Sequence, residues 1–257
     1  MKEYTLITGA SSGLGKDFAY EYAKKKENLI LVARRLDLLE RIAKDLKEYE
    51  IDVLVYSCDL GSKDAIDQFC DNLPKDIFVA RLINNAGFGN HSPYDEQSEA
   101  TLIQMLRVNV EALSLLTYRF IPMMKEYLKG EILNVASVAA FTSGPFMAEY
   151  YASKAYVLSL SLALRDELKD YKIKVSALCP GPTHTNFFKV AKNGPSLMFE
   201  KFTMDSLPVV KKSMRDLHAN KAISVPGFRN KLLVIITKFS SRTFVSNIVK
   251  KIQETRS

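Results

Sequence analysis

The sequence has few cysteines and no long hydrophobic run. Its three cysteines, Cys58, Cys70 and Cys179, lie far apart and form no CxxC or Cys/His zinc-binding spacing. This sparse, odd number favours reduced thiols in a cytoplasmic protein over a disulfide framework. The N-terminal residues contain no apolar run of signal-peptide length, and the most apolar later segment, 232–236, is far too short to cross a bilayer. We therefore expect a cytoplasmic protein with no transmembrane segment and no metal site.

The sequence also lacks internal repeats, low-complexity tracts and any linker rich in proline, glycine and serine. Without features that would divide the chain, its 257 residues fit one large α/β domain. Apolar residues make up 47% and charged residues 25%, which is enough apolar material for a sizeable core. We predict a single domain over residues 1–257.

The formal charge of +7 comes without a basic tail, since the longest basic run is only Lys24–Lys26. The 36 lysines and arginines are scattered among 29 acidic residues, a pattern typical of solvated helix faces. Nucleic-acid binding has no support beyond this charge. We expect a small-molecule substrate and no nucleic acid as partner.

Short apolar runs alternate with stretches of helical periodicity, such as 15–26 and 36–49, along most of the chain. The runs are rich in β-branched and aliphatic residues, as parallel strands buried on both faces are. The predicted strands are Tyr4–Thr8, Asn28–Ala33, Asp52–Ser57, Ala80–Asn84, Gly130–Ala136, Ile173–Cys179 and Ala222–Val225. This alternation predicts an α/β fold of the Rossmann type, a doubly wound parallel sheet of about seven strands with helices on both faces. In such sheets ligands bind at the carboxyl ends of the strands, where the strand order reverses.

A glycine-rich stretch, TGASSGLG at Thr8–Gly15, follows the first predicted strand. Glycines allow a tight turn and a close backbone approach to a ligand, and the start of the next helix offers free N–H groups to an anion. The spacing is neither GxGxxG nor that of a P-loop, and a purely structural turn is the alternative. Its place after the first strand favours a phosphate cradle formed by Gly9, Ser11, Ser12, Gly13, Leu14 and Gly15.

Two arginines, Arg34 and Arg35, follow the second predicted strand. Arg34 lies 19 residues after Gly15, where an acidic residue would hold the free 2′-hydroxyl of NAD. A cation there suits the 2′-phosphate of NADP instead. Asp37 is close enough to compete, but it fits better as an N-terminal acid of the next helix. Unless the arginines are only solvated surface, they predict NADP(H) over NAD(H).

Further polar motifs follow the later strands in a fixed order. They are NNAG at Asn84–Gly87, Asn109 in a helical stretch, Ser137 ahead of YxxxK at Tyr150–Lys154, and PGxxxT at Pro180–Thr185. Together with the glycine-rich turn, these motifs make the chain resemble a short-chain dehydrogenase/reductase over about residues 4–190. Within that family it looks closest to an NADP-dependent bacterial-type branch near the acyl-carbonyl and steroid reductases.

The resemblance implies hydride transfer between the nicotinamide of NADP(H) and a carbonyl or alcohol carbon. In the family's pattern Tyr150 would protonate the carbonyl oxygen and Ser137 would hydrogen-bond it. Lys154 would bind the nicotinamide ribose and lower the tyrosine pKa, and Asn109 would hold a water that links Lys154 to solvent. Read singly, Ser137 could cap a strand end and Asn109 could be a polar residue that bends its helix.

The resemblance also implies which residues contact the cofactor. Asp59 would contact adenine, unless it is only an N-terminal helix acid, and Thr183 and Thr185 would bind the nicotinamide carboxamide. The remaining expected contacts are Leu60, Asn85, Ala86, Gly87, Tyr150, Lys154, Pro180 and Gly181.

Two tyrosines stand side by side in EYYASK, and both lie near Lys154 on a helix predicted over 148–169. Tyr150 lies about 40° from Lys154 around the helix axis and Tyr151 about 60° to the other side, so spacing alone does not decide. Tyr151 is in register with Leu158 and Leu162, which favours a packing role, and Ser137 precedes Tyr150 by the family's 13 positions. We predict that Tyr150 is the acid.

The sequence of the last third of the chain says less about its structure and function. Asn186–Leu217 is apolar and aromatic, which fits either a lid over a hydrophobic carbonyl substrate or helices packed on the core. Two apolar, basic helical stretches, 230–239 and 243–252, form an extension over 228–257 that could close the site, join subunits or rest on a membrane. We expect a homodimer or homotetramer. A non-catalytic NADP(H)-binding regulator on the same fold is the alternative function.

Overall fold

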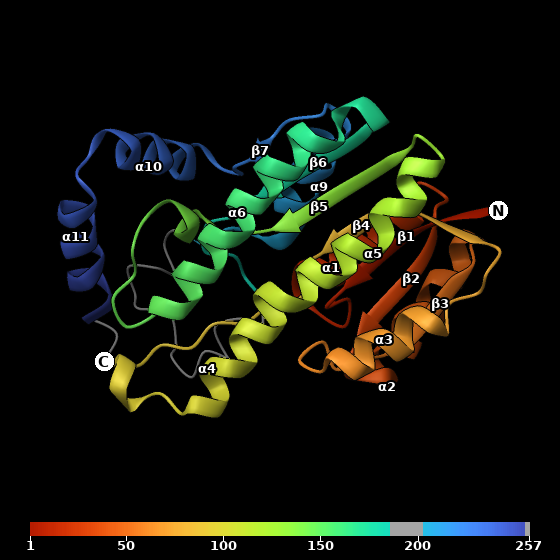
Figure 1. Ribbon diagram of the computed structural model, residues 1–257, viewed down its shortest axis with the longest axis horizontal. Helices are drawn as coiled ribbons and strands as arrows, with labels where there is room; N and C mark the ends of the chain where they lie inside the picture. The colour runs from red at the N-terminus through yellow and green to blue at the C-terminus, as the bar shows by residue number, and fades with distance from the viewer. Residues whose placement is uncertain (186–202, 255–257) are drawn as a thin grey trace.

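A parallel sheet of seven strands forms the centre of the protein (Figure 1). The computed structural model describes residues 1–185 and 203–254. The strands are β1 (Lys2–Thr8), β2 (Asn28–Ala33), β3 (Val53–Ser57), β4 (Ile77–Asn84), β5 (Gly130–Val135), β6 (Ile173–Leu178) and β7 (Ile223–Ser224). Their order across the sheet is β3-β2-β1-β4-β5-β6-β7, so it reverses between β1 and β4. The predicted doubly wound sheet is confirmed.

The largest difference from the predicted strands concerns β4, which begins at Ile77 instead of Ala80. Its first residues pair with Lys2, Glu3 and Tyr4 of β1, and the register then shifts between Tyr4 and Thr5. This irregularity gives both strands extra length at their amino ends, whereas their carboxyl ends lie where predicted. The residues that follow β1 and β4 therefore meet at the reversal point.

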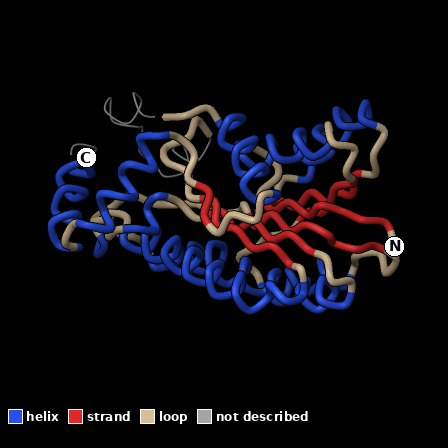
Figure 2. The backbone as a smooth tube through the Cα atoms, turned by 90° about the horizontal axis from the view of Figure 1, so that it is seen from above, coloured by secondary structure: helices blue, strands red, loops and turns tan. Residues whose placement is uncertain are grey.

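Helices cover both faces of the sheet, as Figure 2 shows. Successive strand residues point to opposite faces, and the two cores divide accordingly. Leu6 and Ile30 pack with one group of helices, α3 (Lys63–Asp71), α5 (Leu113–Glu126) and α6 (Ala148–Leu168). Ile7 and Leu29 pack with the other, α1 (Gly13–Ala23), α2 (Leu36–Leu46) and α9 (Ser206–His218).

The remaining helices lie towards the ends of the core. α4 (Glu99–Leu106) continues into α5 through a π-helical turn, Arg107–Ala112. α10 (Phe228–Phe239) and α11 (Arg242–Glu254) follow β7 and lie at the end of the molecule opposite β3 (Figure 1). Short 3₁₀ segments occur at Lys47–Tyr49, Tyr94–Glu96, Val138–Phe141 and Lys169–Tyr171. In residues 1–185 and 203–254, no helix combines the length and apolarity that a bilayer span requires.

The segment expected to be a lid or a packed helix divides into two parts. Its aromatic first part falls on 186–202, outside the described residues. Its second part forms α9, whose Val209, Val210 and Leu217 are buried against the sheet. Helix α9 is thus a core helix, which is one of the two alternatives that the sequence left open.

Asp216 ties the end of α9 to β7 and predicts a measurable effect on stability. Its buried carboxylate accepts hydrogen bonds from Lys212 Nζ at 2.6 Å, Lys221 Nζ at 2.8 Å and Ser224 Oγ at 2.7 Å. Burial favours the neutral acid, but these hydrogen bonds outweigh it and hold the pKa of Asp216 at about 2. We expect Asp216→Asn to lower the free energy of unfolding at pH 7 by about 2 kcal/mol and the Tm by about 4–8 °C.

The pH dependence of this effect has a definite sign. Because the folded pKa lies below the ordinary value of 3.8, the stabilisation is fully present above that value and is lost as the pH falls towards 2. Urea unfolding of the native protein and of Asp216→Asn should therefore differ most near pH 7 and converge in acid. A difference that stayed constant or grew below pH 4 would contradict the assignment.

Candidate active site

The turn between β1 and α1 is built from glycines that no larger residue could replace. Gly9 and Gly13 have φ angles of +64° and +55°, which glycine adopts without strain. A Cβ on Gly15 would lie 2.3 Å from the carbonyl oxygen of Gly9 and 2.6 Å from Asn85 Nδ2. No side-chain hydrogen bond from Ser12 caps α1. The turn therefore leaves the first N–H groups of the helix available to an anion.

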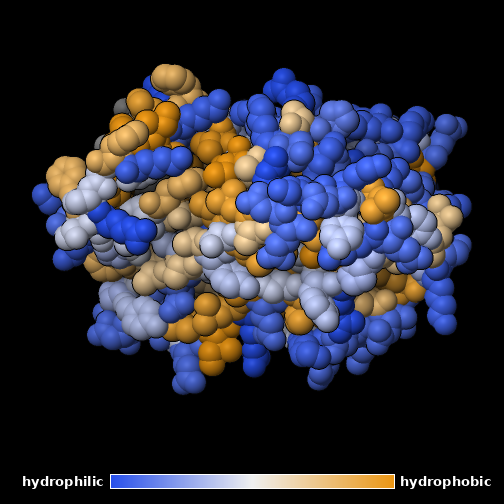
Figure 3. All heavy atoms as spheres, turned by 45° about the horizontal axis from the view of Figure 1, so that its top comes forward, coloured by the Kyte–Doolittle hydropathy of each residue, from blue (hydrophilic) through white to orange (hydrophobic). Residues whose placement is uncertain are grey.

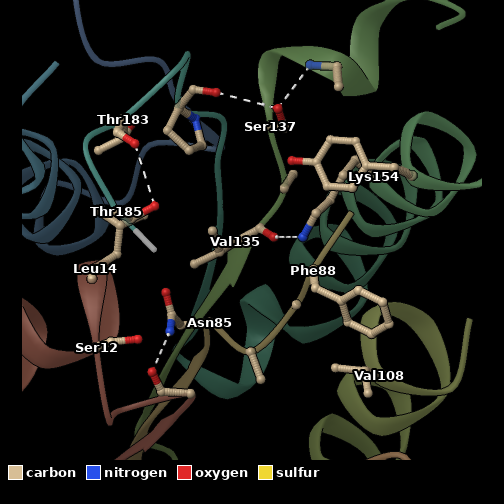
Figure 4. A pocket seen from close by; sticks show the side chains of 18 of the residues that line it. Ser12, Leu14, Asn85, Phe88, Val108, Val135, Ser137, Lys154, Thr183 and Thr185 are labelled. Atoms are coloured by element: carbon tan, nitrogen blue, oxygen red, sulfur yellow. Dashed lines mark hydrogen bonds between the residues drawn. The ribbon is translucent and has the colours of Figure 1, made fainter. Parts of the chain in front are cut away.

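Thr8 and Asn85 join this turn to the residues after β4. Thr8 Oγ1 accepts hydrogen bonds from the backbone N–H groups of Asn85 and Ala86, each at 3.0 Å. Asn85 Nδ2 in turn donates to Thr8 O at 2.9 Å and to Gly9 O at 3.3 Å, and Figure 4 shows the second of these bonds. The two loops at the reversal of the strand order are thus fixed to each other by side chains of the TG and NNAG motifs.

Arg34 and Arg35 lie exposed where β2 ends and α2 begins. Arg35 Nη2 donates to Ser11 Oγ of the glycine-rich turn at 3.2 Å. Asp37 lies in the first turn of α2 and does not line the cavity described below. Asp37 therefore occupies the place expected of an N-terminal helix acid. Arg34 and Arg35 line the cavity, whereas Asp37 does not.

Ser137, Tyr150 and Lys154 meet at the other end of the cavity. Lys154 is 4% exposed, and its Nζ donates to Val135 O at 2.8 Å and lies 5.8 Å from the centre of the Tyr150 ring (Figure 4). Ser137 Oγ accepts from Ala139 N at 3.1 Å and also hydrogen-bonds the Tyr150 hydroxyl. The end of β5 and the first turns of α6 thus bring together the three side chains that the sequence singled out.

Burial dominates the protonation of this group in the protein alone. It raises the pKa of Tyr150 to about 12, although the hydrogen bond from Ser137 acts in the opposite direction. Burial also lowers the pKa of Lys154 to about 8. Lys154 is not among the groups that shift the Tyr150 pKa in the protein alone, so its expected effect on the tyrosine pKa beside a bound nicotinamide stays a prediction. The Tyr150 hydroxyl therefore keeps its proton at neutral pH in the protein alone.

Asn109 lies in the π-helical turn, and its side-chain amide forms hydrogen bonds with other groups of the protein. Oδ1 accepts from Phe88 N at 3.0 Å, and Nδ2 donates to Phe88 O at 2.9 Å and to Ser153 Oγ at 3.1 Å. Asn109 is 1% exposed and does not line the cavity. The side chain therefore holds the Phe88 loop against α6 with both hydrogens of Nδ2, and the water that the resemblance implied stays a prediction.

A cavity of about 890 Å³ connects the two ends of the site. Of the expected residues it is lined by Gly9, Ser11, Ser12, Gly13, Leu14, Arg34, Arg35, Asp59, Leu60, Asn85, Ala86, Gly87, Ser137, Tyr150, Lys154, Pro180, Gly181, Thr183 and Thr185. Gly15 does not line it, because it packs against Gly9 and Asn85 instead. Thr183 and Thr185, labelled in Figure 4, lie on the loop after β6 and face the glycine-rich turn.

Several lining residues were not expected from the sequence. Phe88, Val108, Met147 and Gln253 contribute to the wall near Tyr150, and Gln253 comes from α11, far away in the chain. Gln253 is 2% exposed, and its Nε2 lies 3.4 Å from the hydroxyl of Tyr151. Phe88 directly follows NNAG, which could have suggested it, whereas Gln253 belongs to no motif.

Tyr151 packs within its own chain. Its ring lies so close to Gly144 that a Cβ there would come within 2.3 Å of it, and it meets the Tyr150 ring edge-on at 6.0 Å between centres. Its hydroxyl points to Gln253. Tyr151 therefore joins the start of α6 to α11, as a packing residue, while Tyr150 has the contact with Ser137.

The residues present fit a dinucleotide. The cradle after β1 would hold the pyrophosphate at the start of α1, the cations after β2 would lie at the adenosine end, and Tyr150 and Lys154 would lie at the nicotinamide end. The glycine turn packs closely on the neighbouring loops, since a Cβ on Gly9 would lie 2.9 Å from Asn85 Nδ2 and one on Gly13 would lie 3.0 Å from Thr185 Cβ. A Rossmann sheet with this cradle and a Ser-Tyr-Lys group defines a nicotinamide-dependent dehydrogenase.

Comparison with known proteins agrees with this assignment. The family model for short chain dehydrogenases matches residues 3–195, and the chain belongs to this family. The chain is 34% identical over 217 residues to an NADP-dependent 3-hydroxy acid dehydrogenase of Schizosaccharomyces pombe, with 82% of this chain and 83% of that protein covered. It is 32% identical over 195 residues to a 7beta-hydroxysteroid dehydrogenase of Clostridium sardiniense, with 76% and 74% covered.

Among solved structures, a short-chain dehydrogenase from Sphingobium yanoikuyae in complex with NADPH has a similar fold. The TM-score is 0.82 at 28% sequence identity, and the alignment covers 93% of this chain and 94% of that one. The protein is thus an oxidoreductase of the short-chain dehydrogenase family that acts on hydroxyl or carbonyl groups with a nicotinamide cofactor.

Proposed function

We propose that the protein is an NADP(H)-dependent reductase of apolar or aromatic carbonyl compounds, and that Tyr150 is its proton donor. One observation carries the proposal. A single cavity has Arg34 and Arg35 at one end and Ser137, Tyr150 and Lys154 at the other. A cofactor that spans it would have its 2′-phosphate and its nicotinamide next to groups suited to each.

The proposed roles follow from the contacts of each side chain. The bound nicotinamide supplies the hydride. Tyr150 gives its proton to the carbonyl oxygen, and Ser137, hydrogen-bonded to the Tyr150 hydroxyl, holds that oxygen in place. Lys154 is anchored by Val135 O and has two further N–H donors for the ribose hydroxyls. Asn109 acts as a positioning residue, because it joins the Phe88 loop to Ser153, the residue before Lys154.

The preference for NADP(H) is supported by charge. Arg34 and Arg35 line the cavity at its adenosine end, whereas Asp37, the acid that could bind a free 2′-hydroxyl, does not. The Schizosaccharomyces pombe relative is named NADP-dependent, and the Sphingobium yanoikuyae structure contains NADPH. Asp59 would contact the adenine, as the resemblance implies.

The substrate class is supported by the wall near Tyr150. Phe88, Val108 and Met147 are apolar, and Gln253 and Tyr151 supply the polar groups on that side. Such a wall excludes water and offers few anchors for a sugar. Of the two named relatives, the 7beta-hydroxysteroid dehydrogenase is named after a largely apolar substrate, whereas the other is named after a 3-hydroxy acid, which carries a carboxylate.

A substrate panel tests the proposal. We expect NADPH-dependent reduction of acetophenone and cyclohexanone with kcat/KM at least about tenfold above that of dihydroxyacetone or a hexose. Burying two more methylene-sized apolar groups in the transition state is enough to give a ratio of this size. Nicotinamide absorbance is the readout, and each ketone is paired with a polar compound of similar size. Turnover of only the polar compounds would overturn the substrate class. Tight NADPH binding with no turnover of any carbonyl would favour the non-catalytic regulator.

Location and assembly form part of the same proposal. The three free cysteines suit a reducing cytoplasm, where we place the protein. Association into a homodimer or homotetramer follows from the resemblance, and sedimentation velocity at micromolar concentration tests it. A monomer at all concentrations would exclude it.

A further inference from the structure

α10 and α11 expose an unusual number of large apolar side chains. Eight of the 19 exposed large apolar residues in the described part of the chain belong to these two consecutive helices. Phe228 and Phe239, at the two ends of α10, are 80% and 88% exposed. The others are Leu232, Leu233, Ile235, Ile236, Phe244 and Ile248. Figure 3 shows hydrophobic side chains gathered over the end of the molecule where the two helices lie.

The exposed apolar residues of α10 lie on one face, which they share with the exposed Arg229. At about 100° per residue, the six apolar side chains between Phe228 and Phe239 fall within an arc of about 160°. Val234, 7% exposed, lies on the opposite side and packs on the protein. Lys231 and Lys238 lie about 20° apart at the boundary between the two faces. An amphipathic helix that lies in a bilayer surface has its lysines at this boundary, where they reach the headgroups.

The excess positive charge of the protein is concentrated in the same helices. Residues 228–257 contain seven lysines and arginines and one acidic residue, whereas residues 1–227 contain 29 and 28. Six of the seven net charges therefore come from the last 30 residues. The basic character that the sequence indicates for 230–239 and 243–252 thus accounts for most of the net charge.

A small lysine-lined cavity lies beside α10. It has a volume of about 210 Å³, and Lys212 and Lys221 from the end of α9 and the loop after it meet Lys231 and Lys238 from α10 there. The carboxylate of Asp216 already binds Lys212, Lys221 and Ser224. Neither Lys231 nor Lys238 has an ion-pair partner among the described residues. The two lysines at the edge of the apolar face thus have free charge for an anionic group.

We propose that α10 and α11 dock the protein on the surface of an anionic phospholipid bilayer, with the apolar face of α10 among the acyl chains and Lys231 and Lys238 at the headgroup phosphates. On α11, Phe244, Ile248 and Lys251 share one side and extend the same surface. A second copy of the chain fits less well, because a symmetric contact would bring two basic surfaces together. The inner leaflet of cell membranes carries the complementary negative charge.

Vesicle co-sedimentation of the whole protein tests the proposal. We expect binding to phosphatidylcholine vesicles with about 30% phosphatidylserine, and at least about tenfold weaker binding to pure phosphatidylcholine. Lys231→Glu with Lys238→Glu should weaken binding to the anionic vesicles by at least about 25-fold, at about fivefold for each lysine. Leu232→Ser with Ile236→Ser should weaken it at least about tenfold. Both pairs are exposed, so the fold should survive the changes.

Matched controls distinguish docking through α10 and α11 from nonspecific electrostatic attraction and nonspecific hydrophobic adsorption. Lys25→Glu with Lys44→Glu makes the same change of charge on exposed residues of the α1 and α2 regions, and Tyr118→Ser removes an exposed aromatic from α5. All controls should bind vesicles like the native protein. Absence of vesicle binding, or equal losses in the control variants, would overturn the proposal. So would a change of sedimentation coefficient in Leu232→Ser with Ile236→Ser at unchanged vesicle binding, since the face would then join two copies.

Discussion

Replacing Tyr150 by phenylalanine is expected to lower kcat by about 10²–10⁴-fold, because the variant has no proton to give to the carbonyl oxygen. The ring keeps its edge-on contact with Tyr151 and its place above Lys154, so the cavity keeps its shape. Binding of NADPH should change by less than about threefold, since the phenol hydroxyl is one contact among many. Steady-state turnover of a ketone and a fluorescence titration with NADPH measure the two effects separately.

Tyr151→Phe is the matched control for this prediction. It removes a hydroxyl one residue further on, whose contact is with Gln253 of α11. That variant should keep turnover within about fivefold of the native enzyme, because one neutral hydrogen bond of 3.4 Å is lost. If Tyr151→Phe were the inactive variant and Tyr150→Phe the active one, the acid would have to be reassigned.

Replacing Arg34 by aspartate is expected to weaken NADPH binding by about 10- to 100-fold, because a charge-assisted contact with the 2′-phosphate becomes a repulsion. Binding of NADH, which has no phosphate there, should change little or improve. The ratio of the two dissociation constants, measured by titration, is the readout. The native protein should prefer NADPH at least about tenfold, since Arg35 adds a second contact.

Arg41→Asp is the control for charge alone. Arg41 lies exposed in the next turn of α2, outside the cavity, and its replacement makes the same change of net charge. The ratio of dissociation constants in this variant should equal that of the native protein. Tighter binding of NADH than of NADPH by the native protein would refute the role of Arg34 whatever the variants do.

The fold and the positions of the site motifs could be predicted because they depend on local sequence. Buried parallel strands require continuous apolar runs, and the turn after β1 requires glycine, so both can be recognised in the sequence. Which neighbours a residue contacts cannot be recognised in this way. Asn109 and Gly15 are where the motifs place them, but Asn109 turns to Phe88 and Ser153 and Gly15 packs on Gly9.

Contacts between segments that lie far apart in the chain could also not be predicted from the sequence. Gln253 and Met147 enter the wall of the cavity because α11 folds back onto the start of α6, and nothing in the local pattern of α11 indicates this. The pKa of Tyr150 in the protein alone depends mainly on burial, which cannot be read from the sequence, whereas proximity to a lysine can be read from spacing. The register shift that lengthens β4 likewise depends on its pairing with β1.

The π-helical turn between α4 and α5 has a consequence for insertions and deletions in this region. Such a turn is equivalent to an α-helix with one extra residue. Deleting one residue from Arg107–Ala112 would let the two helices merge into one regular helix without rotating them relative to each other, and only the residues within the turn would change the direction of their side chains. Asn109 could then no longer reach both the Phe88 loop and Ser153. A deletion here would therefore remove the contacts of this one turn and leave α4 and α5 in place.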